Sequence, residues 1–449
     1  MVKSGRSSAI KHVMMTDAHI TVGLDIGTTK VCAVVASTDT RTKRVDIIGM
    51  GVSDCDGLKR GVVTNISKTA DAIRRAVEKA EQQSGFRIGK VVIGVSGEHI
   101  QTFSTRAIVT TSTNEITDSD VRRLHHELRQ LRIPPERRIL HVIPQDYIID
   151  DQDGISDPLG MSGKRLEANA LVITASSSAI ENIYKCADRA GLHVDGVVLQ
   201  PLASAMAVLD EAEKEVGVAL IDIGGGTTDI AVFKDNVLRW TSILGIAGQK
   251  VTDDVVAVLG IRNIEAERIK LEYGHAAADS IMRDEVFQVP GVGGRTPTEV
   301  AKSLLCQIIE PRVEEIYELS LAEVKKSSMA HQLAAGIVIT GGCSLLRGAD
   351  ALAERVFRMP VKIGLPIGFS ADGVAREVSN PMYATAVGLV MYALKHSDEF
   401  EQADHPFVSQ QQAKRVEESP SEPEPVIQPE VPEKKQGVWT RVKDWFENL

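Results

Sequence analysis

The 449-residue sequence has few cysteines and no recognisable pattern among them. The five cysteines are widely scattered and show no C-x-x-C spacing, which argues against a cysteine metal centre and against a disulfide framework. We therefore expect buried, reduced thiols in a cytosolic protein. They are Cys32, Cys55, Cys186, Cys306 and Cys343.

The sequence also lacks a basic excess and a long apolar run. It carries 51 Lys and Arg against 61 Asp and Glu, a net charge of -10, so we expect no nucleic-acid partner. No stretch approaches the ~20 apolar residues of a membrane-spanning helix, and residues 1–19 hold no apolar signal segment. We expect a protein that is neither exported nor transmembrane. A hydrophobic content of 43% indicates a folded body, and the length predicts two or more domains.

A glycine-rich element occurs twice in the sequence. "VGLDIGTTKVCAVV" at 22–35 and "VALIDIGGGTTDIAVF" at 218–233 share an apolar strand, Asp-Ile-Gly, a Gly/Thr tip and a second strand. Short apolar runs on both sides of a glycine-rich tip predict a hairpin rather than a helix start. The duplication predicts two similar halves. A third stretch, "GIVITGGCSLLRGADALAERVF" at 336–357, predicts a strand that ends at Gly341 and Gly342 and continues into a helix.

Strand and helix patterns alternate between these motifs, which predicts an α/β fold. Residues 103–168 break the alternation and predict a small α+β insertion in the first half. Residues 397–436 are rich in Pro, Glu and Gln with hardly any large apolar residue, so they predict a disordered linker. The expected boundaries are 1–19 for a flexible N-terminus, 20–102 and 169–212 for the first half, 103–168 for the insertion, 213–246 and 332–396 for the second half, 247–331 for a further subdomain, 397–436 for the linker and 437–449 for a terminal helix.

The two hairpin tips suit a phosphate group, because Gly and Thr surround a small concavity with backbone N–H groups and hydroxyls. Asp25 and Asp222 precede the tips, where carboxylates beside phosphates require a cation, and water-bound Mg²⁺ is the expected ion. One such hairpin alone is more often only a tight turn, but two of them followed by "TGG" favour a nucleotide site. The predicted phosphate-binding residues are Asp25, Gly27, Thr28, Thr29, Lys30, Asp222, Gly224, Gly225, Gly226, Thr227 and Thr228.

These motifs, in this order, carry a resemblance to a known family. "LDIGTTK", "LIDIGGGTTDIAVF" and "IVITGGCSLLRG" resemble the two phosphate loops and the adenosine loop of the actin/Hsp70/sugar-kinase superfamily. "RRILHVIPQDYIIDDQDGISDPLGMSGKRLEA", "VGGRTPTEVAKSLLCQIIEPRVEEIY" and "YATAVGL" resemble the FtsA family of bacterial cell division proteins, over roughly residues 20–396 and again at the tail. The resemblance implies an actin-like two-domain fold with duplicated RNase H-like subdomains, in which the insertion is the subdomain that distinguishes FtsA from actin.

The resemblance also implies an adenosine-binding side of the site. Glu267 and Lys270, in "AERIK", would contact the ribose and base, although the same pair could form only a surface i,i+3 salt bridge. Gly341, Gly342 and Ser344 belong to the implied adenosine loop.

Two further residues receive a role by resemblance, each with a structural alternative. Gln200 stands where superfamily members place a residue that orients the attacking water, or it is only a polar residue that ends a strand before Pro201. Arg312, in the subdomain 247–331, would contact the C-terminal peptide of FtsZ, or it is an ordinary solvated helix charge.

The last thirteen residues, "GVWTRVKDWFENL", hold two of the three tryptophans. On a helix their apolar residues form one stripe, which could cap the protein's own core, bind a partner groove or lie in a membrane interface. The preceding linker disfavours the first option, and the aromatic residues, like the resemblance, favour the third. Acidic neighbours offset Arg441 and Lys443, so we expect one tail to bind weakly and many tails on a polymer to bind stably. The predicted membrane residues are Val438, Trp439, Val442, Trp445, Phe446 and Leu449.

Together these features predict an ATP-binding, actin-like membrane adaptor with at most slow ATP hydrolysis. The implied cofactors are ATP and Mg²⁺. The implied partners are the C-terminal peptide of FtsZ, further copies of the chain in filaments, other division proteins, and the inner face of the cytoplasmic membrane at the division septum. Three rival interpretations are a small-molecule kinase, an Hsp70-type chaperone and a pilus- or cell-shape-related actin homologue. The tail argues against the first, the absence of a β domain after residue 396 against the second, and the insertion against the third.

Overall fold

The computed structural model describes residues 18–39, 42, 44–281, 283–291, 293–294, 296–370 and 373–397. All of them belong to the first of two compact units, Met1–Phe400. The predicted terminal helix, and all of the predicted linker except Ser397, lie outside the described residues. Within the described ranges, no helix has the length and apolar character needed to cross a membrane. All five cysteines are buried and none forms a disulfide.

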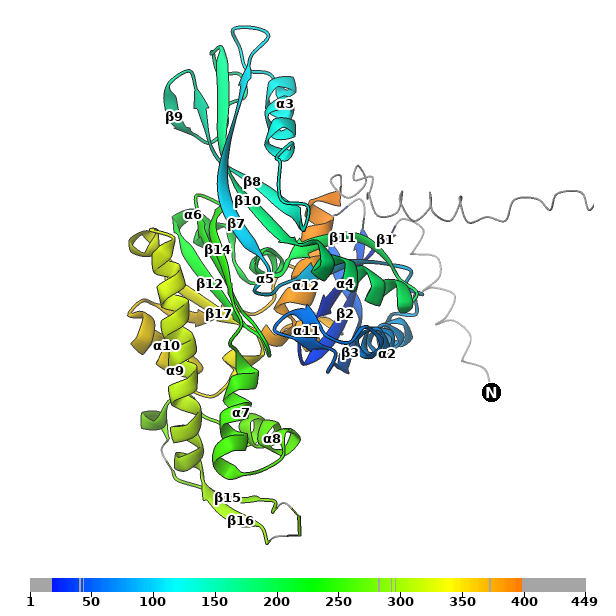
Figure 1. Cartoon of the computed structure of the whole chain (residues 1–449), viewed down its shortest axis with the longest axis vertical. Helices are drawn as coiled ribbons and strands as arrows, with labels where there is room; N and C mark the ends of the chain where they lie inside the picture. Colours follow the sequence, from blue (N-terminus) through cyan, green and yellow to red (C-terminus); the bar gives the residue numbers. More distant parts are fainter. Residues whose placement is uncertain are drawn as a thin grey trace, which may run out of the picture. The chain divides into compact units, whose positions relative to one another are not determined.

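The first sheet is built around the hairpin of the first glycine-rich motif (Figure 1). β1 (Ala18–Ile26), β2 (Lys30–Asp39) and β3 (Val45–Asp54) form an antiparallel meander. β6 (Lys90–Val95) pairs parallel with β1, and β11 (His193–Leu199) pairs parallel with β6. α2 (Ile66–Ser84) and α4 (Ser177–Arg189) bury apolar side chains in the same hydrophobic cluster as this sheet.

The second sheet repeats this plan. β12 (Val218–Ile223), β13 (Thr228–Lys234) and β14 (Val237–Leu244) form the antiparallel meander. β17 (Ile337–Thr340) pairs parallel with β12, and β18 (Val361–Ile363) pairs parallel with β17. In both sheets a parallel strand therefore lies beside the first strand of a meander, which confirms the prediction of two similar halves.

Two helices join the halves through a shared core. α5 (Gln200–Val208) and α12 (Ala384–Lys395) contribute to a hydrophobic cluster that also contains Val34 of β2 and Leu220 of β12. At Gly388 the helices approach so closely that a Cβ would lie 1.8 Å from the carbonyl oxygen of Ala203, so only glycine fits there. The halves are held together by packed apolar side chains as well as by the chain itself.

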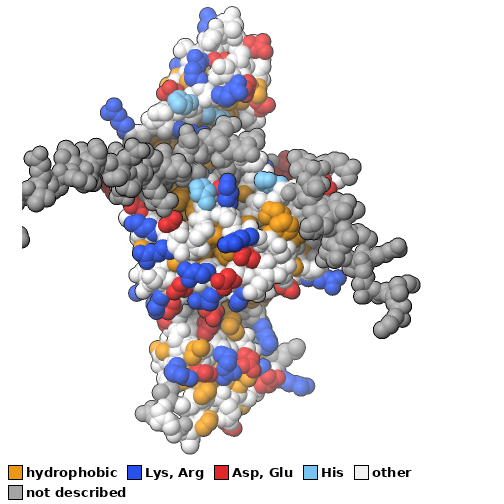
Figure 2. Space-filling view, turned by 90° about the vertical axis from the view of Figure 1, so that its right-hand side faces the viewer, with side chains coloured by type: hydrophobic (Ala, Val, Ile, Leu, Met, Phe, Trp, Pro, Cys, Tyr) orange, Lys and Arg blue, Asp and Glu red, His pale blue; other side chains and the backbone are white. Residues whose placement is uncertain are grey.

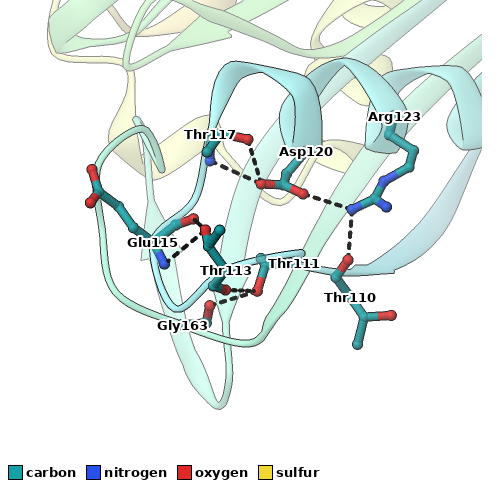
Figure 3. A network of polar contacts seen from close by, with 8 residues as sticks. All are labelled: Thr110, Thr111, Thr113, Glu115, Thr117, Asp120, Arg123 and Gly163. Carbon is teal, nitrogen blue, oxygen red and sulfur yellow. Dashed lines mark hydrogen bonds and ion pairs between the residues drawn. The ribbon is translucent and has the colours of Figure 1, made fainter.

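The insertion is a four-stranded sheet with one helix. β7 (Gln101–Thr110), β8 (Arg137–Ile149), β9 (Gln152–Ile155) and β10 (Arg165–Ser176) lie in the order β7-β10-β8-β9, and α3 (Asp118–Arg129) packs on them (Figure 1). Figure 3 shows how α3 begins: Asp120 accepts hydrogen bonds from the Thr117 N–H (3.0 Å) and hydroxyl (2.6 Å) and from Arg123 (2.7 Å). Arg123 also donates to the carbonyl oxygen of Thr110 (2.6 Å), which ties α3 to the end of β7.

The second half carries a mainly helical extension. α7 (Gly248–Leu259), α8 (Asn263–Tyr273), α9 (Lys302–Lys326) and α10 (Ala349–Phe357) share a core cluster with β12, β13 and β17. The shorter elements are β4 (Leu58–Lys59), β5 (Val62–Val63), α6 (Glu211–Val216), β15 (Val286–Val289), β16 (Thr298–Ala301), α11 (Ala375–Val378) and four 3₁₀ turns at Ala278–Ser280, Ala330–Gln332, Gly342–Leu345 and Pro381–Tyr383.

Charges of both signs are interspersed on the face that Figure 2 shows. On and beside α2, Arg74 pairs with Asp71 (2.7 Å) and Lys68 with Asp56 (2.6 Å). Such exposed pairs neutralise each other locally and contribute little to stability.

Candidate functional site

The tips of the two glycine-rich hairpins meet at a cavity of about 370 Å³. A Cβ on Gly225 would lie 2.6 Å from the Thr29 methyl group, and a Cβ on Gly226 would lie 2.2 Å from the Thr28 hydroxyl. The two tips can approach this closely only because the second tip consists of glycines, which have no Cβ. A volume of this size suits a small-molecule ligand or cofactor.

Three buried carboxyl groups lie at the hairpin side of the cavity. Asp25 and Asp222 are each 7% exposed and Asp229 is 3% exposed. Burial raises the pKa of Asp25 to about 6, against the attraction of Lys30 and with a contribution from Asp222. Burial likewise raises the pKa of Asp222, and burial together with the charge of Asp222 raises the pKa of Asp229 well above its usual range. The cluster of like charges favours a cationic ligand or bound cation.

Hydrogen bonds hold these carboxyl groups in fixed orientations. Gln200 Nε2 donates to Asp25 Oδ1 (3.1 Å). Ser204 Oγ donates to Asp222 Oδ2 (2.6 Å). Ser96 Oγ, directly after the first-half strand β6, donates to Asp229 Oδ1 (2.5 Å) of the second half, so this bond links the two halves beside the cavity.

Lys30 is the basic residue beside this cluster. Its ammonium group donates to the Met382 carbonyl oxygen and lies 4.8 Å from the centre of the Tyr383 ring. These contacts hold the ammonium at the cavity, where it attracts both Asp25 and Asp222.

The far side of the cavity is formed by α8 and the turn after β17. Lys270, 7% exposed, pairs with Glu267 (2.7 Å) and donates to Thr252 Oγ1 (2.9 Å). The pair is the expected i,i+3 salt bridge, but Lys270 is buried and both residues line the cavity, so the pair is not simply a surface one. Gly341 has φ of 84° and leaves no room for a Cβ beside Asp222, whereas Gly342 faces open space. The turn thus presents bare backbone to the cavity.

The structure brings nearly all predicted nucleotide-site residues to this cavity, whereas the six predicted membrane residues lie outside the described residues. Two exceptions are Thr228 and Ser344, which are fully buried and are not among the lining residues. Thr228 donates its hydroxyl to the Ile246 carbonyl oxygen (2.7 Å) and Ser344 donates to Gly341 (2.7 Å), so both hold loops that surround the cavity. The predicted residues that line it are Asp25, Gly27, Thr28, Thr29, Lys30, Gln200, Asp222, Gly224, Gly225, Gly226, Thr227, Glu267, Lys270, Gly341 and Gly342.

Arg312 lies elsewhere, on α9. It binds both oxygens of Asp254 on α7 (2.6 and 3.1 Å) and also pairs with Glu315. These carboxylates raise the pKa of the guanidinium. Arg312 therefore joins two helices, and its charge is already compensated.

Some lining residues were not predicted from the sequence. Asp229 directly follows the Thr-Thr pair of the second hairpin, where the first hairpin has Lys30, and it lies opposite Asp222 in the strand register. A position-by-position comparison of the two hairpins would have identified Asp229 from the sequence. Gln249 and Met382 also line the cavity but lie in no motif of the sequence, whereas Thr385 lies in "YATAVGL", to which no site role was given.

Comparisons with known proteins agree with this architecture. The family described as "Cell division protein FtsA" matches residues 219–388, and the one described as "SHS2 domain inserted in FTSA" matches residues 97–174, which contain most of the insertion. The cell division protein FtsA of Pseudomonas aeruginosa is 44% identical over 378 residues, which cover 84% of this chain and 90% of that protein.

Two solved structures are similar in fold. The PilM–PilN type IV pilus biogenesis complex has a TM-score of 0.59 at 16% identity and covers 83% of this chain and 98% of that one. MreB5 of Spiroplasma citri, solved with ADP, has a TM-score of 0.53 at 15% identity and covers 86% and 99%. These likenesses show an actin-like fold, and the sequence relatives identify the branch within it. The chain belongs to the FtsA family of cell division proteins.

Proposed function

We propose that this protein binds ATP with Mg²⁺ in the cavity between its halves, and that the nucleotide-bound form assembles into filaments that hold FtsZ at the inner face of the membrane during division. The observation that carries the proposal is the meeting of two phosphate-type hairpin tips, one from each half, at one cavity. A ligand that touches both tips favours the arrangement in which the halves are close together.

The hairpin tips suit the phosphate end of the nucleotide. Their Gly and Thr residues offer backbone N–H groups and hydroxyls, and Lys30 offers a positive charge. Gln200 lies beside Asp25 at the same end, and an amide at this position can orient a water molecule toward a terminal phosphate. A site that hydrolyses ATP and a site in which ATP only stabilises one arrangement of the halves would use the same groups.

The carboxyl groups fit Mg²⁺. Asp25 and Asp222 are buried and close enough for Asp222 to raise the pKa of Asp25. Both could hold the ion through its water molecules. When bound, the ion supplies positive charge to the phosphates. The protein's own part is to keep the two carboxylates fixed through Gln200 and Ser204.

The far side of the cavity suits the adenosine. Lys270 and Glu267 offer a buried donor and a partly exposed acceptor from one helix face. Gly341 and Gly342 offer a side-chain-free surface against which a flat base can lie. The MreB5 structure, solved with ADP, has the same fold.

The family assignment supports the division role and directs the partner proposals. We propose that the FtsZ peptide binds the subdomain 247–331. Because Arg312 is engaged by Asp254 and Glu315, we assign it to the stability of this subdomain, and an acidic peptide would have to displace those carboxylates to reach it.

The terminal segment 437–449 is proposed as the membrane contact. Its aromatic and aliphatic residues alternate with charges at helical spacing, and its net charge gives little attraction to anionic lipid. Attachment would then depend on several tails in one filament.

Co-sedimentation with liposomes tests the whole proposal. FtsZ should pellet with lipid only when the full-length protein and Mg·ATP are both present, and not with a version that ends at Gln436. Trp445→Ala should weaken pelleting, whereas Thr440→Ala, on the opposite face of the predicted helix, should leave it unchanged. Equal performance by the shortened protein would refute the membrane role, and turnover of ATP with a sugar or acetate would favour a kinase instead.

A further inference from the structure

A histidine of the insertion reaches the backbone beside the candidate nucleotide site. His141 lies on β8, and its Nε2 accepts a hydrogen bond from the backbone N–H of Leu199 (3.0 Å). Leu199 is fully buried, ends β11 and directly precedes Gln200, the first residue of α5. A buried N–H that loses its acceptor is costly, so this bond holds the chain at the start of α5.

The imidazole is suited to accept this bond. Burial, together with the nearby His396, lowers the pKa of His141 to about 4, so the ring is neutral near pH 7. A neutral ring that accepts at Nε2 carries its proton on Nδ1. The ring also contacts Tyr392 of α12 edge-on, with a centroid distance of 6.0 Å. The insertion, β11 and α12 therefore meet at this side chain.

Gln200 connects the backbone of Leu199 to the cavity. Its side chain donates to Asp25 (3.1 Å) and passes over Gly94 of β6, where a Cβ would lie 2.9 Å from Gln200 Cγ. With so little free space, the orientation of the Gln200 amide depends on where the backbone of Leu199 is held.

The same strand of the insertion also contacts the second half. Four residues after His141, Gln145 Nε2 donates to the Leu238 carbonyl oxygen (3.0 Å). The Gln145 carbonyl oxygen accepts from Arg239 (2.8 Å), and both of these partners lie on β14. Two residues of β8 that are four positions apart therefore contact both halves. One bonds Leu199 beside the cavity, and the other bonds β14 of the second half.

We propose that His141 is a positioning residue, which fixes Gln200 and Asp25 through the Leu199 N–H and so couples the insertion to the nucleotide cavity. This inference rests on the proposed nucleotide binding for its functional consequence. A partner that shifts the insertion would change the nucleotide site through this bond, and bound nucleotide would stabilise the position of β8 in return.

The test compares three full-length variants. His141→Leu removes the acceptor, His141→Gln restores one at similar reach, and His125→Leu is the matched control. His125 lies on α3 of the insertion and bonds Tyr147 (2.8 Å), with no contact to Leu199. Two measurements are made: hydrogen–deuterium exchange of residues 196–206 without nucleotide, and the Kd for a fluorescent ATP analogue with Mg²⁺.

His141→Leu should raise exchange in 196–206 and weaken nucleotide binding about 10-fold, the effect of losing one hydrogen bond at a buried group. His141→Gln should recover most of both, and His125→Leu should change neither, even where its melting temperature falls. Unchanged exchange in His141→Leu would overturn the link to Leu199, and raised exchange with an unchanged Kd would overturn the coupling. If the wild-type protein binds no nucleotide, the proposed function fails, and the exchange comparison alone decides the role of His141.

Discussion

At the residue scale, the candidate site depends on positions that have no space for a Cβ. Gly225 and Gly226 lie against Thr29 and Thr28 of the other half, and Gly341 lies against Asp222. Each of these glycines allows two backbone segments to approach more closely than any other residue would. The cavity is therefore defined as much by missing side chains as by the charged ones.

Gly226→Ala should separate the hairpin tips. The added methyl group would lie 2.2 Å from the Thr28 hydroxyl, so the loops must move apart. Overpacking of this kind costs about 1–3 kcal/mol, which corresponds to a loss of Mg·ATP affinity of roughly 5- to 150-fold. Equilibrium binding of a fluorescent ATP analogue measures the loss. Gly89→Ala is the control, because a Cβ there meets open space, and equal affinities of the two variants would contradict the geometry.

The sequence predicts most individual site residues but not their neighbours. Both hairpins and the Gly341-Gly342 turn are local patterns, so their residues could be named in advance. Asp229 was missed although it lies in one of the motifs, because it was compared with no counterpart in the first hairpin. The pairing of Arg312 with Asp254, on another helix, has no local signal, so its engaged charge could not be foreseen.

At the scale of elements, the start of α3 depends on one carboxylate. Asp120→Ala would remove the acceptor of two Thr117 bonds and one Arg123 bond (Figure 3). We expect a loss of about 1–2 kcal/mol in the stability of the insertion, typical of a lost helix N-terminal interaction. Urea unfolding and hydrogen exchange of α3 measure it.

Asp118→Ala provides the matched control for this helix. Asp118 pairs with Arg122 at i,i+4 (2.6 Å), but both side chains are more than half exposed, so the pair should be worth no more than about 0.5 kcal/mol. A similar loss in both variants would show that the network around Asp120 has no special role.

Element prediction succeeded where the pattern is local and failed where packing decides. The alternating strands and helices and the insertion follow from periodicity and turn residues. α9 continues through Pro311, a residue that normally ends or kinks a helix, and no element was predicted there from the sequence. Its buried contacts with α7 and α10 hold the helix together on both sides of the proline. The hairpin of β15 and β16 inside the subdomain 247–331 was not predicted, although Pro-Gly and Gly-Gly pairs stand between its two strands.

At the scale of the whole molecule, the proposed nucleotide would contact both halves, so its binding should stabilise the complete unit. Mg·ATP at 100 times its Kd should raise the free energy of unfolding by about 2.7 kcal/mol and the melting temperature by a few degrees. Differential scanning fluorimetry with and without EDTA measures the shift. Gly226→Ala should show a smaller shift at the same ATP concentration, and a wild-type protein that melts identically with and without Mg·ATP would refute the binding proposal.

The assembly of the halves is the part of the fold least visible in the sequence. The duplicated motifs predict two similar sheets, but not that α5 and α12 fill one core between them. That core combines residues from β2, β12 and α12, which are separated by more than a hundred positions along the chain. Contacts over such distances leave no periodic signal, and only the resemblance to a known fold supplied them.

The position of α12 has a consequence for synthesis on the ribosome. This helix packs against the first strand of the chain, with Gly23 of β1 close to the Ala386 carbonyl oxygen. At about 5–20 residues per second, a nascent β1 waits roughly 20–70 s for residues 384–395 to emerge. During this interval one face of the first sheet is open to chaperones and proteases. An interrupted translation product therefore exposes apolar surface and becomes a substrate for degradation, and only a chain synthesised past α12 can reach the finished core.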